Sequence, residues 1–147
     1  MKRSFILLVA IAVAGVVAGG GSAQAAPRSG ALHVTKECSR YDGQAGSFCT
    51  ITSSSIPQIR PGSRVVYAAA AGDPTPGVLD GDLVIDGPGN NDAFGHVVLD
   101  LSTLSGVVTL SGGTGEFRHF RAGPLAVACP TFPDCSWNGP YSFGPRD

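Results

Sequence analysis

The sequence has 147 residues and a nearly balanced charge, with 10 Lys and Arg against 11 Asp and Glu. A basic surface for nucleic acid or for an anionic membrane is therefore not expected. Only 14% of the residues are charged, whereas 21 are Gly and 11 are Pro, a composition that indicates short strands joined by turns.

A secretory leader is predicted at the N-terminus. Lys2 and Arg3 precede an apolar run from Phe5 to about Val17, and the small residues around Gln24 suit signal peptidase, so we expect cleavage after Ala25. The apolar run is shorter than the roughly 18 residues that a membrane span needs. We expect a signal peptide at 1–25 and a single extracellular domain at 26–147, whose charge is −3 because 8 basic residues then face 11 acidic ones.

Short apolar segments recur along the predicted domain, and each ends at a Gly- or Pro-rich turn. The candidate strands are Leu32–Cys38, Phe48–Ser54, Ser63–Ala70, Val78–Asp86, Phe94–Leu101, Ser105–Ser111, Glu116 to about Cys129, and Trp137–Phe143. No helical period follows the leader. Eight such strands predict an all-β fold, an eight-stranded antiparallel β-barrel, because closure leaves no exposed sheet edge.

The cysteines Cys38, Cys49, Cys129 and Cys135 all lie in the predicted mature chain, at spacings that do not resemble a zinc site. Disulfides are expected in an oxidising compartment, with three possible connectivities. We favour Cys38 with Cys49 and Cys129 with Cys135, because each pair closes a short loop rich in turn-forming residues.

The stretch LSGGTGEFRHFRAG, residues 110–123, encodes a turn followed by a strand. Gly112, Gly113 and Gly115 are predicted to shape the turn, since glycine adopts positive φ at little cost. The stretch lacks the Lys-Ser/Thr pair of a phosphate-binding loop and no helix pattern follows it. Alternation after the turn predicts that Phe117 anchors the barrel wall and shares a face with His119.

No metal site or cofactor is predicted. An EF-hand loop starting at Asp80 fails, because Val84 and Asn91 stand where an oxygen ligand and a Glu are needed. The three histidines, His33, His96 and His119, have no second ligand at a metal-binding spacing. No nucleophile motif of a hydrolase occurs.

The turn and strand of residues 110–123 resemble the glycine-rich motif of the dirigent proteins and allene oxide cyclases, through Gly112, Gly113, Thr114, Gly115, Phe117 and Gly123. The layout from FCTITSS to YSFG is similar to that of a small secreted bacterial group with the same barrel. The resemblance implies the eight-stranded barrel of that superfamily. Its plant members guide radical coupling or cyclise a fatty-acid epoxide, but their catalytic residues have no assigned match in this chain.

Three functions stay open. The first is binding of a small apolar or aromatic molecule inside the barrel, for which the candidate residues are Tyr67, Asp82, Asp100, His119 and Trp137. The second is an isomerase or stereochemical guide like the resembled families, which requires a carboxylate or Tyr with a shifted pKa in the cavity; Asp86, Glu116 and Arg118 are further candidates. The third is a structural or interaction protein that forms homo-oligomers through an apolar outer wall.

Overall fold

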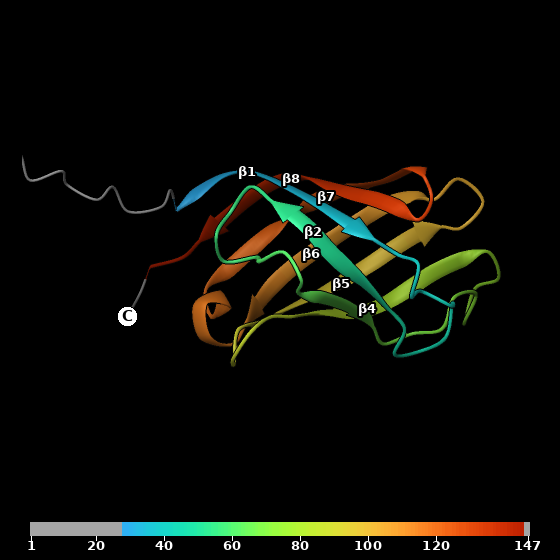
Figure 1. Ribbon diagram of the computed structural model, residues 1–147, viewed down its shortest axis with the longest axis horizontal. Helices are drawn as coiled ribbons and strands as arrows, with labels where there is room; N and C mark the ends of the chain where they lie inside the picture. The colour runs from blue at the N-terminus through green and yellow to red at the C-terminus, as the bar shows by residue number, and fades with distance from the viewer. Residues whose placement is uncertain (1–27, 146–147) are drawn as a thin grey trace, which may run out of the picture.

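The computed structural model describes residues 28–145, which form a closed barrel of eight antiparallel strands (Figure 1). The strands follow one another around the barrel in chain order, and β8 pairs with β1 to close it. Their bounds are β1 Ser29–Glu37, β2 Phe48–Ser54, β3 Arg64–Tyr67, β4 Val78–Asp86, β5 Asp92–Asp100, β6 Ser105–Gly113, β7 Phe120–Thr131 and β8 Asp134–Phe143. The predicted eight-stranded barrel is confirmed, and the predicted signal peptide lies outside the described residues.

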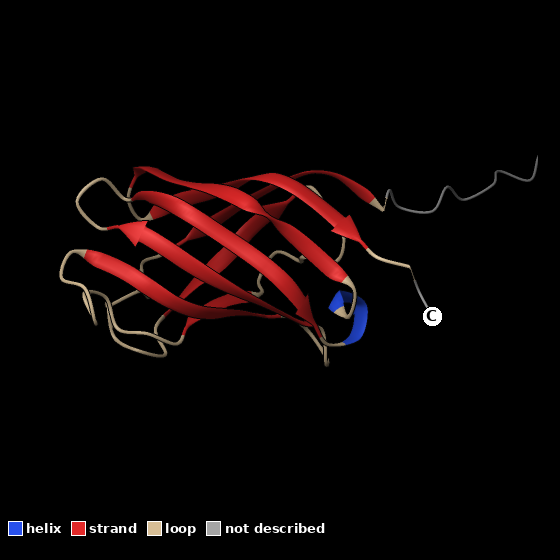
Figure 2. Ribbon diagram, turned by 180° about the vertical axis from the view of Figure 1, so that it is seen from behind, coloured by secondary structure: helices blue, strands red, loops and turns tan. Residues whose placement is uncertain are grey.

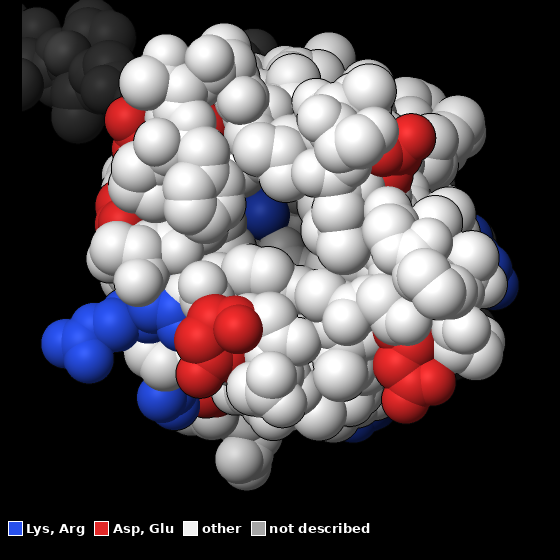
Figure 3. Space-filling model, turned by 90° about the vertical axis from the view of Figure 1, so that its right-hand side faces the viewer, with Lys and Arg blue, Asp and Glu red and all other residues white. Residues whose placement is uncertain are grey.

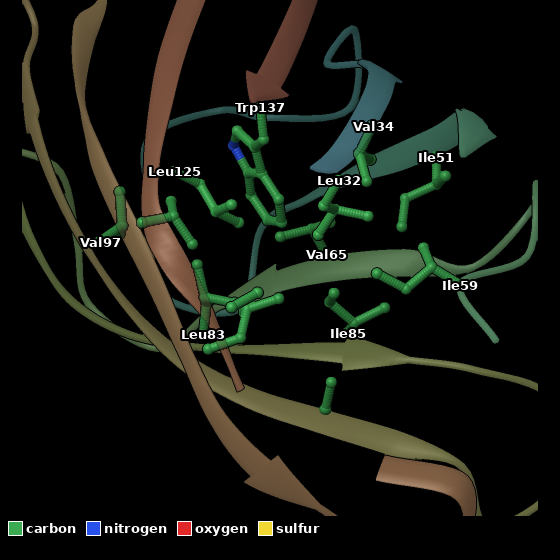
Figure 4. Packing of buried hydrophobic residues seen from close by; sticks show 14 of the residues in the cluster. Leu32, Val34, Ile51, Ile59, Val65, Leu83, Ile85, Val97, Leu125 and Trp137 are labelled. Carbon is green, nitrogen blue, oxygen red and sulfur yellow. The ribbon is translucent and has the colours of Figure 1, made fainter. Parts of the chain in front are cut away.

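The alternation of side chains along each strand fills the barrel interior. In β5, Ala93 and Val97 are buried, whereas Phe94 and Val98 on the opposite face are 44% and 45% exposed. Figure 4 shows the buried side chains converging from opposite walls, with the indole of Trp137 among them. Most of the barrel interior is therefore a packed core.

The start of the seventh strand differs from the prediction. Residues Gly115–Phe117 form a short 3-10 turn, η1, and β7 begins only at Phe120. Phe117 is 1% exposed and its ring packs edge-on against Phe120 at 5.3 Å. Phe117 thus anchors the core as expected, but from a turn that covers one end of the barrel and not from a strand (Figure 2).

The three predicted turn glycines shape the entry to η1. Gly112 and Gly115 have φ of +90° and +54°. Gly113 has ordinary φ, but a Cβ atom there would lie 1.9 Å from the Asp92 carbonyl oxygen. Thr114 Oγ1 accepts a hydrogen bond from the Asp92 N–H at 3.0 Å, so the turn is fastened to the start of β5.

The two ends of the barrel differ. One end carries η1 and both ends of the described chain, and the other carries the β1–β2, β3–β4, β5–β6 and β7–β8 connections, at the right of Figure 1. Both disulfides lie toward this second end, which we call the open end. They join Cys38 to Cys49 and Cys129 to Cys135, the predicted pairing. No helix within residues 28–145 is long and apolar enough to cross a membrane.

Replacing Gly113 by Ala is expected to lower the free energy of unfolding by about 2 kcal/mol, the range typical of overpacking, because the new methyl group forces β5 and β6 apart. Gly30→Ala is the matched control. It also has ordinary φ, and the three atoms nearest to its Cβ would all belong to the Tyr141 side chain, the first of them at 3.3 Å. Denaturant unfolding of both variants would measure the difference; equal stabilities would contradict the close approach at Gly113.

A candidate binding pocket at the open end of the barrel

A pocket with a volume of about 40 Å³ lies inside the open end. Its wall is apolar and comes from several strands and connections: Leu79, Val97, Leu99, Leu101, Leu104, Val127 and Phe132. Its polar groups belong to Lys36, Tyr41, Tyr67 and Trp137, beside both disulfides. Figure 3 shows this end as a hollow rimmed by uncharged atoms, with a basic atom at its centre and the other charges at the periphery. Of the described residues that line the pocket, only Lys36 is basic.

Lys36 points inward because of its place in β1. Leu32, Val34, Lys36 and Cys38 alternate with outward-facing residues, and all four are buried. The lysine is only 4% exposed, which is rare for this residue type unless it has a charged partner. Lys2 is the only other lysine in the sequence, so the one lysine of the predicted mature chain is an interior residue.

The ammonium group of Lys36 contacts aromatic and sulfur atoms and has no carboxylate partner among the described residues. Its Nζ donates a hydrogen bond to Tyr67 Oη at 2.7 Å and lies 3.8 Å from both sulfurs of the Cys38–Cys49 disulfide. The ring centroids of Trp137 and Tyr67 lie 5.1 and 5.4 Å away, within cation–π range. The ion pairs found in the described part of the chain do not include Lys36.

Burial determines the protonation states of Lys36 and Tyr67 in the pocket. Desolvation lowers the pKa of Lys36 from 10.5 to about 7, because the charged form loses its hydration and gains no counter-ion. Desolvation raises the pKa of Tyr67, with a smaller contribution from Tyr41. Tyr67 therefore stays a neutral phenol across the range in which Lys36 exchanges its proton.

Two further donors of the pocket are unpaired. Trp137 Nε1 and Tyr41 Oη are buried and have no hydrogen-bond partner among residues 28–145. Buried polar atoms are normally satisfied, so these two atoms are open to a partner from outside the described chain. Ammonium, indole and phenol groups donate hydrogen bonds, and none of the described lining side chains is a carboxylate. The arrangement is suited to an oxygen-bearing acceptor group.

Two of the five predicted binding residues, Tyr67 and Trp137, line this pocket, and the other three do not. Asp82 is on the outer face of β4, because Leu79, Leu83 and Ile85 occupy the inner face. Asp100 is exposed, and its carboxylate accepts hydrogen bonds from the Ser102 and Thr103 N–H groups in the β5–β6 turn. A hydrogen bond from the Ser102 hydroxyl, followed by these two N–H bonds, holds the pKa of Asp100 below its usual value.

The third misplaced candidate, His119, lies between η1 and β7 at the end away from the pocket, where its carbonyl accepts the Gly144 N–H at 2.8 Å. The further candidates are also elsewhere. Asp86 forms an exposed ion pair with Arg64 at 2.8 Å, and Glu116 and Arg118 are exposed around η1. The polar strand positions that we considered mostly face outward, as the alternation of their apolar neighbours requires.

The residue that our sequence interpretation missed is Lys36. A signal for it exists, since the run LHVTKEC places Leu32, Val34, Lys36 and Cys38 on one face of a strand. A lysine in phase with buried residues is the pattern that would have identified it.

The fold and the pocket together define a small disulfide-bonded β-barrel with one interior amine near its open end. No family model, no curated protein and no solved structure matches this chain.

Lys36 makes the stability of the barrel depend on pH. Between its folded pKa of about 7 and its unfolded value of 10.5, the unfolded chain binds a proton that the native chain does not, so the free energy of unfolding rises with pH. We expect a gain of about 2 kcal/mol from pH 7 to pH 9, since the slope approaches 1.4 kcal/mol per pH unit. Above about pH 10 the raised pKa of Tyr67 opposes the gain, because only the unfolded chain then loses that proton.

Guanidinium unfolding of the native protein and of Lys36→Met, with the disulfides intact, would isolate this contribution. The variant is expected to be more stable near pH 6 and to lack the extra rise toward pH 9, because it removes the buried charge. Parallel pH profiles for the two proteins would contradict the shifted pKa of Lys36.

His96 on β5 bridges two carboxylates of β4, outside the pocket. Its Nδ1 and Nε2 lie 2.9 and 2.8 Å from oxygens of Asp82 and Asp80. The Asp82 hydrogen bond is the main cause that raises the pKa of His96; desolvation opposes it, and the Asp80 hydrogen bond and the charges of both carboxylates add to the rise. We expect an NMR titration of His96 with a midpoint above 6.5 that falls in Asp82→Asn. Asp86→Asn, which breaks the pair with Arg64 instead, should leave it unchanged.

Proposed function

We propose that this protein is a secreted barrel that binds a small apolar or aromatic molecule by an acidic head group, which enters the open-end pocket and pairs with Lys36. The observation that carries the proposal is a buried lysine that lines an accessible pocket and has no carboxylate partner within residues 28–145. Strongly perturbed titratable groups in a concave site are frequent at functional sites.

The chemistry of the pocket favours an anion. A carboxylate beside Nζ would supply the counter-ion that the described chain does not provide, and it would restore the protonated state of Lys36. The unpaired Trp137 Nε1–H and Tyr41 hydroxyl are additional donors for its oxygens. The apolar wall matches a hydrocarbon or aromatic body better than a sugar or nucleotide.

The size of the pocket restricts what enters it. About 40 Å³ is far below the several hundred Å³ that enclose a drug-sized ligand. A buried water needs about 10–15 Å³ on the same measure, so the pocket has room for a group of about three non-hydrogen atoms, such as a carboxylate. The body of the ligand would then lie in the mouth, against Leu104 and Phe132, which come from the β5–β6 and β7–β8 connections.

Other observations support parts of the proposal. Two disulfides are compatible with an extracellular protein, as the predicted leader requires. The glycine motif and the eight-stranded barrel agree with the resemblance to the dirigent proteins and allene oxide cyclases.

An isomerase or stereochemical guide of that kind is the second candidate function. The observation in its favour is Tyr67, an interior phenol with a raised pKa. The carboxylates that we considered for proton transfer, Asp82, Asp86, Asp100 and Glu116, do not line the pocket. Such a reaction would therefore use Lys36 as its base and Tyr67 as its acid.

A non-catalytic interaction protein is the third candidate, and the outer wall of the barrel favours it. Phe94, Val98 and Val107 on β5 and β6 are each more than 40% exposed, and Val98 pairs directly with Val107. Light scattering that shows a monomer at all concentrations would count against a homo-oligomer formed through this wall.

Fluorescence of Trp137 tests the leading proposal, because it is the single tryptophan and it lines the pocket. Benzoate is expected to change the emission saturably at pH 6, whereas benzyl alcohol, of similar shape but uncharged, should bind more weakly. The affinity for benzoate should fall by about tenfold per pH unit above pH 7, because binding then requires a proton at Lys36.

Lys36→Met is the control, and it should lose the preference for benzoate over benzyl alcohol. Repeating the titration with hexanoate and hexanol would show whether a flexible aliphatic body is accepted. Equal binding of acid and alcohol, or the same acid preference in Lys36→Met, would contradict the proposal.

A further inference from the structure

Lys36 meets two requirements of a nucleophilic amine. Lys36 lines a pocket at the open end, where Figure 3 shows a hollow in the surface, so a small reactant reaches it. It also exists in the neutral form near neutral pH, because burial lowers its pKa to about 7 and no described carboxylate of the pocket opposes this. Ordinary surface lysines are almost wholly protonated at this pH and react slowly.

Tyr67 is placed to move protons for this amine. Its hydroxyl is 2.7 Å from Nζ, and a phenol both donates and accepts a hydrogen bond. Among the described lining residues the one further titratable side chain is Tyr41, whose ring centroid is 5.2 Å from that of Tyr67 and whose pKa is also raised. Of the described lining residues, none is Asp, Glu, His or Arg, so the chemistry depends on the amine and the two phenols.

The small volume of the pocket beside Lys36 favours an aldehyde over a ketone as the reactant. Room for about three non-hydrogen atoms admits the carbon and oxygen of an aldehyde with the next carbon of its chain. A ketone carries a second carbon substituent on the reacting atom, which the packed wall of Val97, Val127 and Leu79 leaves little space for.

We infer that Lys36 condenses with small apolar aldehydes to form an imine, with Tyr67 relaying protons between nitrogen and oxygen. The neutral amine forms a C–N bond to the carbonyl carbon, and the carbonyl electron pair moves to oxygen, which takes a proton from nitrogen through Tyr67. The resulting hydroxyl then takes the second nitrogen proton by the same route and leaves as water, and the C=N bond forms. No oxidant, reductant or metal takes part in this condensation. The inference uses the pocket of the proposed function but requires a reactive amine there in place of a charged one.

Reductive trapping tests the inference on the secreted chain with both disulfides intact. The protein is incubated at pH 7 with butanal and sodium cyanoborohydride, and peptide mapping by mass spectrometry locates the reduced butyl group. We expect the adduct at Lys36, formed at least about tenfold faster in the native protein than in the guanidinium-unfolded one, where its pKa returns to 10.5. Butan-2-one should give much less adduct than butanal.

Two variants complete the experiment. Lys36→Met should lose the adduct and leave only the labelling of the N-terminal amine. Tyr67→Phe should keep the adduct but form it more slowly. Circular dichroism should show that both variants remain folded. An unmodified Lys36, or equal rates in native and unfolded protein, would overturn the inference. If benzoate binds in preference to benzyl alcohol but butanal gives no adduct, the imine inference is wrong and the proposed function stands. If benzoate shows no such preference and butanal gives no adduct, both are wrong.

Discussion

Closure of the sheet between β1 and β8 is the constraint on which the rest of this structure depends. Nine residue pairs, from Ser29 with Ser142 to Glu37 with Asp134, join the first and last strands. This pairing leaves the sheet without a free edge, and from Leu32 onward it directs every second side chain of β1 into the barrel interior. Burial of the apolar side chains of Leu32 and Val34 stabilises the barrel. Lys36 follows them in phase, and the barrel cannot turn it outward without moving Leu32 and Val34 into water.

The burial of Lys36 therefore has a cost that the fold imposes and that neighbouring residues only partly offset. Two aromatic rings and one phenolic oxygen surround the ammonium, but ring quadrupoles replace hydration less completely than a carboxylate does. The result is an amine near the boundary between its two protonation states. Such a group responds to small changes in its surroundings, which an interior leucine would not do.

The sequence predicted the fold well, because strand alternation and turn-forming residues are local signals. The strand count, the closed barrel and the disulfide pairing were all correct, and the glycine run at Gly112 to Gly115 shapes a turn as expected. The 3-10 turn at Gly115–Phe117 was missed because its contacts with Asn91 come from a distant part of the chain. Tyr67 and Trp137 were placed among the pocket candidates, whereas Asp82 and Asp100 were not distinguishable from interior residues until the inner face of each strand was known. Lys36 was recognisable from its phase with Leu32, Val34 and Cys38, but it was not among the candidates that we considered.

The Cys38–Cys49 disulfide has an effect on the pocket beyond holding β1 to β2. Both sulfurs lie 3.8 Å from Lys36 Nζ, and as a disulfide they carry no charge. The disulfide therefore fills this side of the amine with neutral sulfur, so the cross-link that fastens β1 to β2 also surrounds Lys36 with atoms that offer its charge no counter-ion.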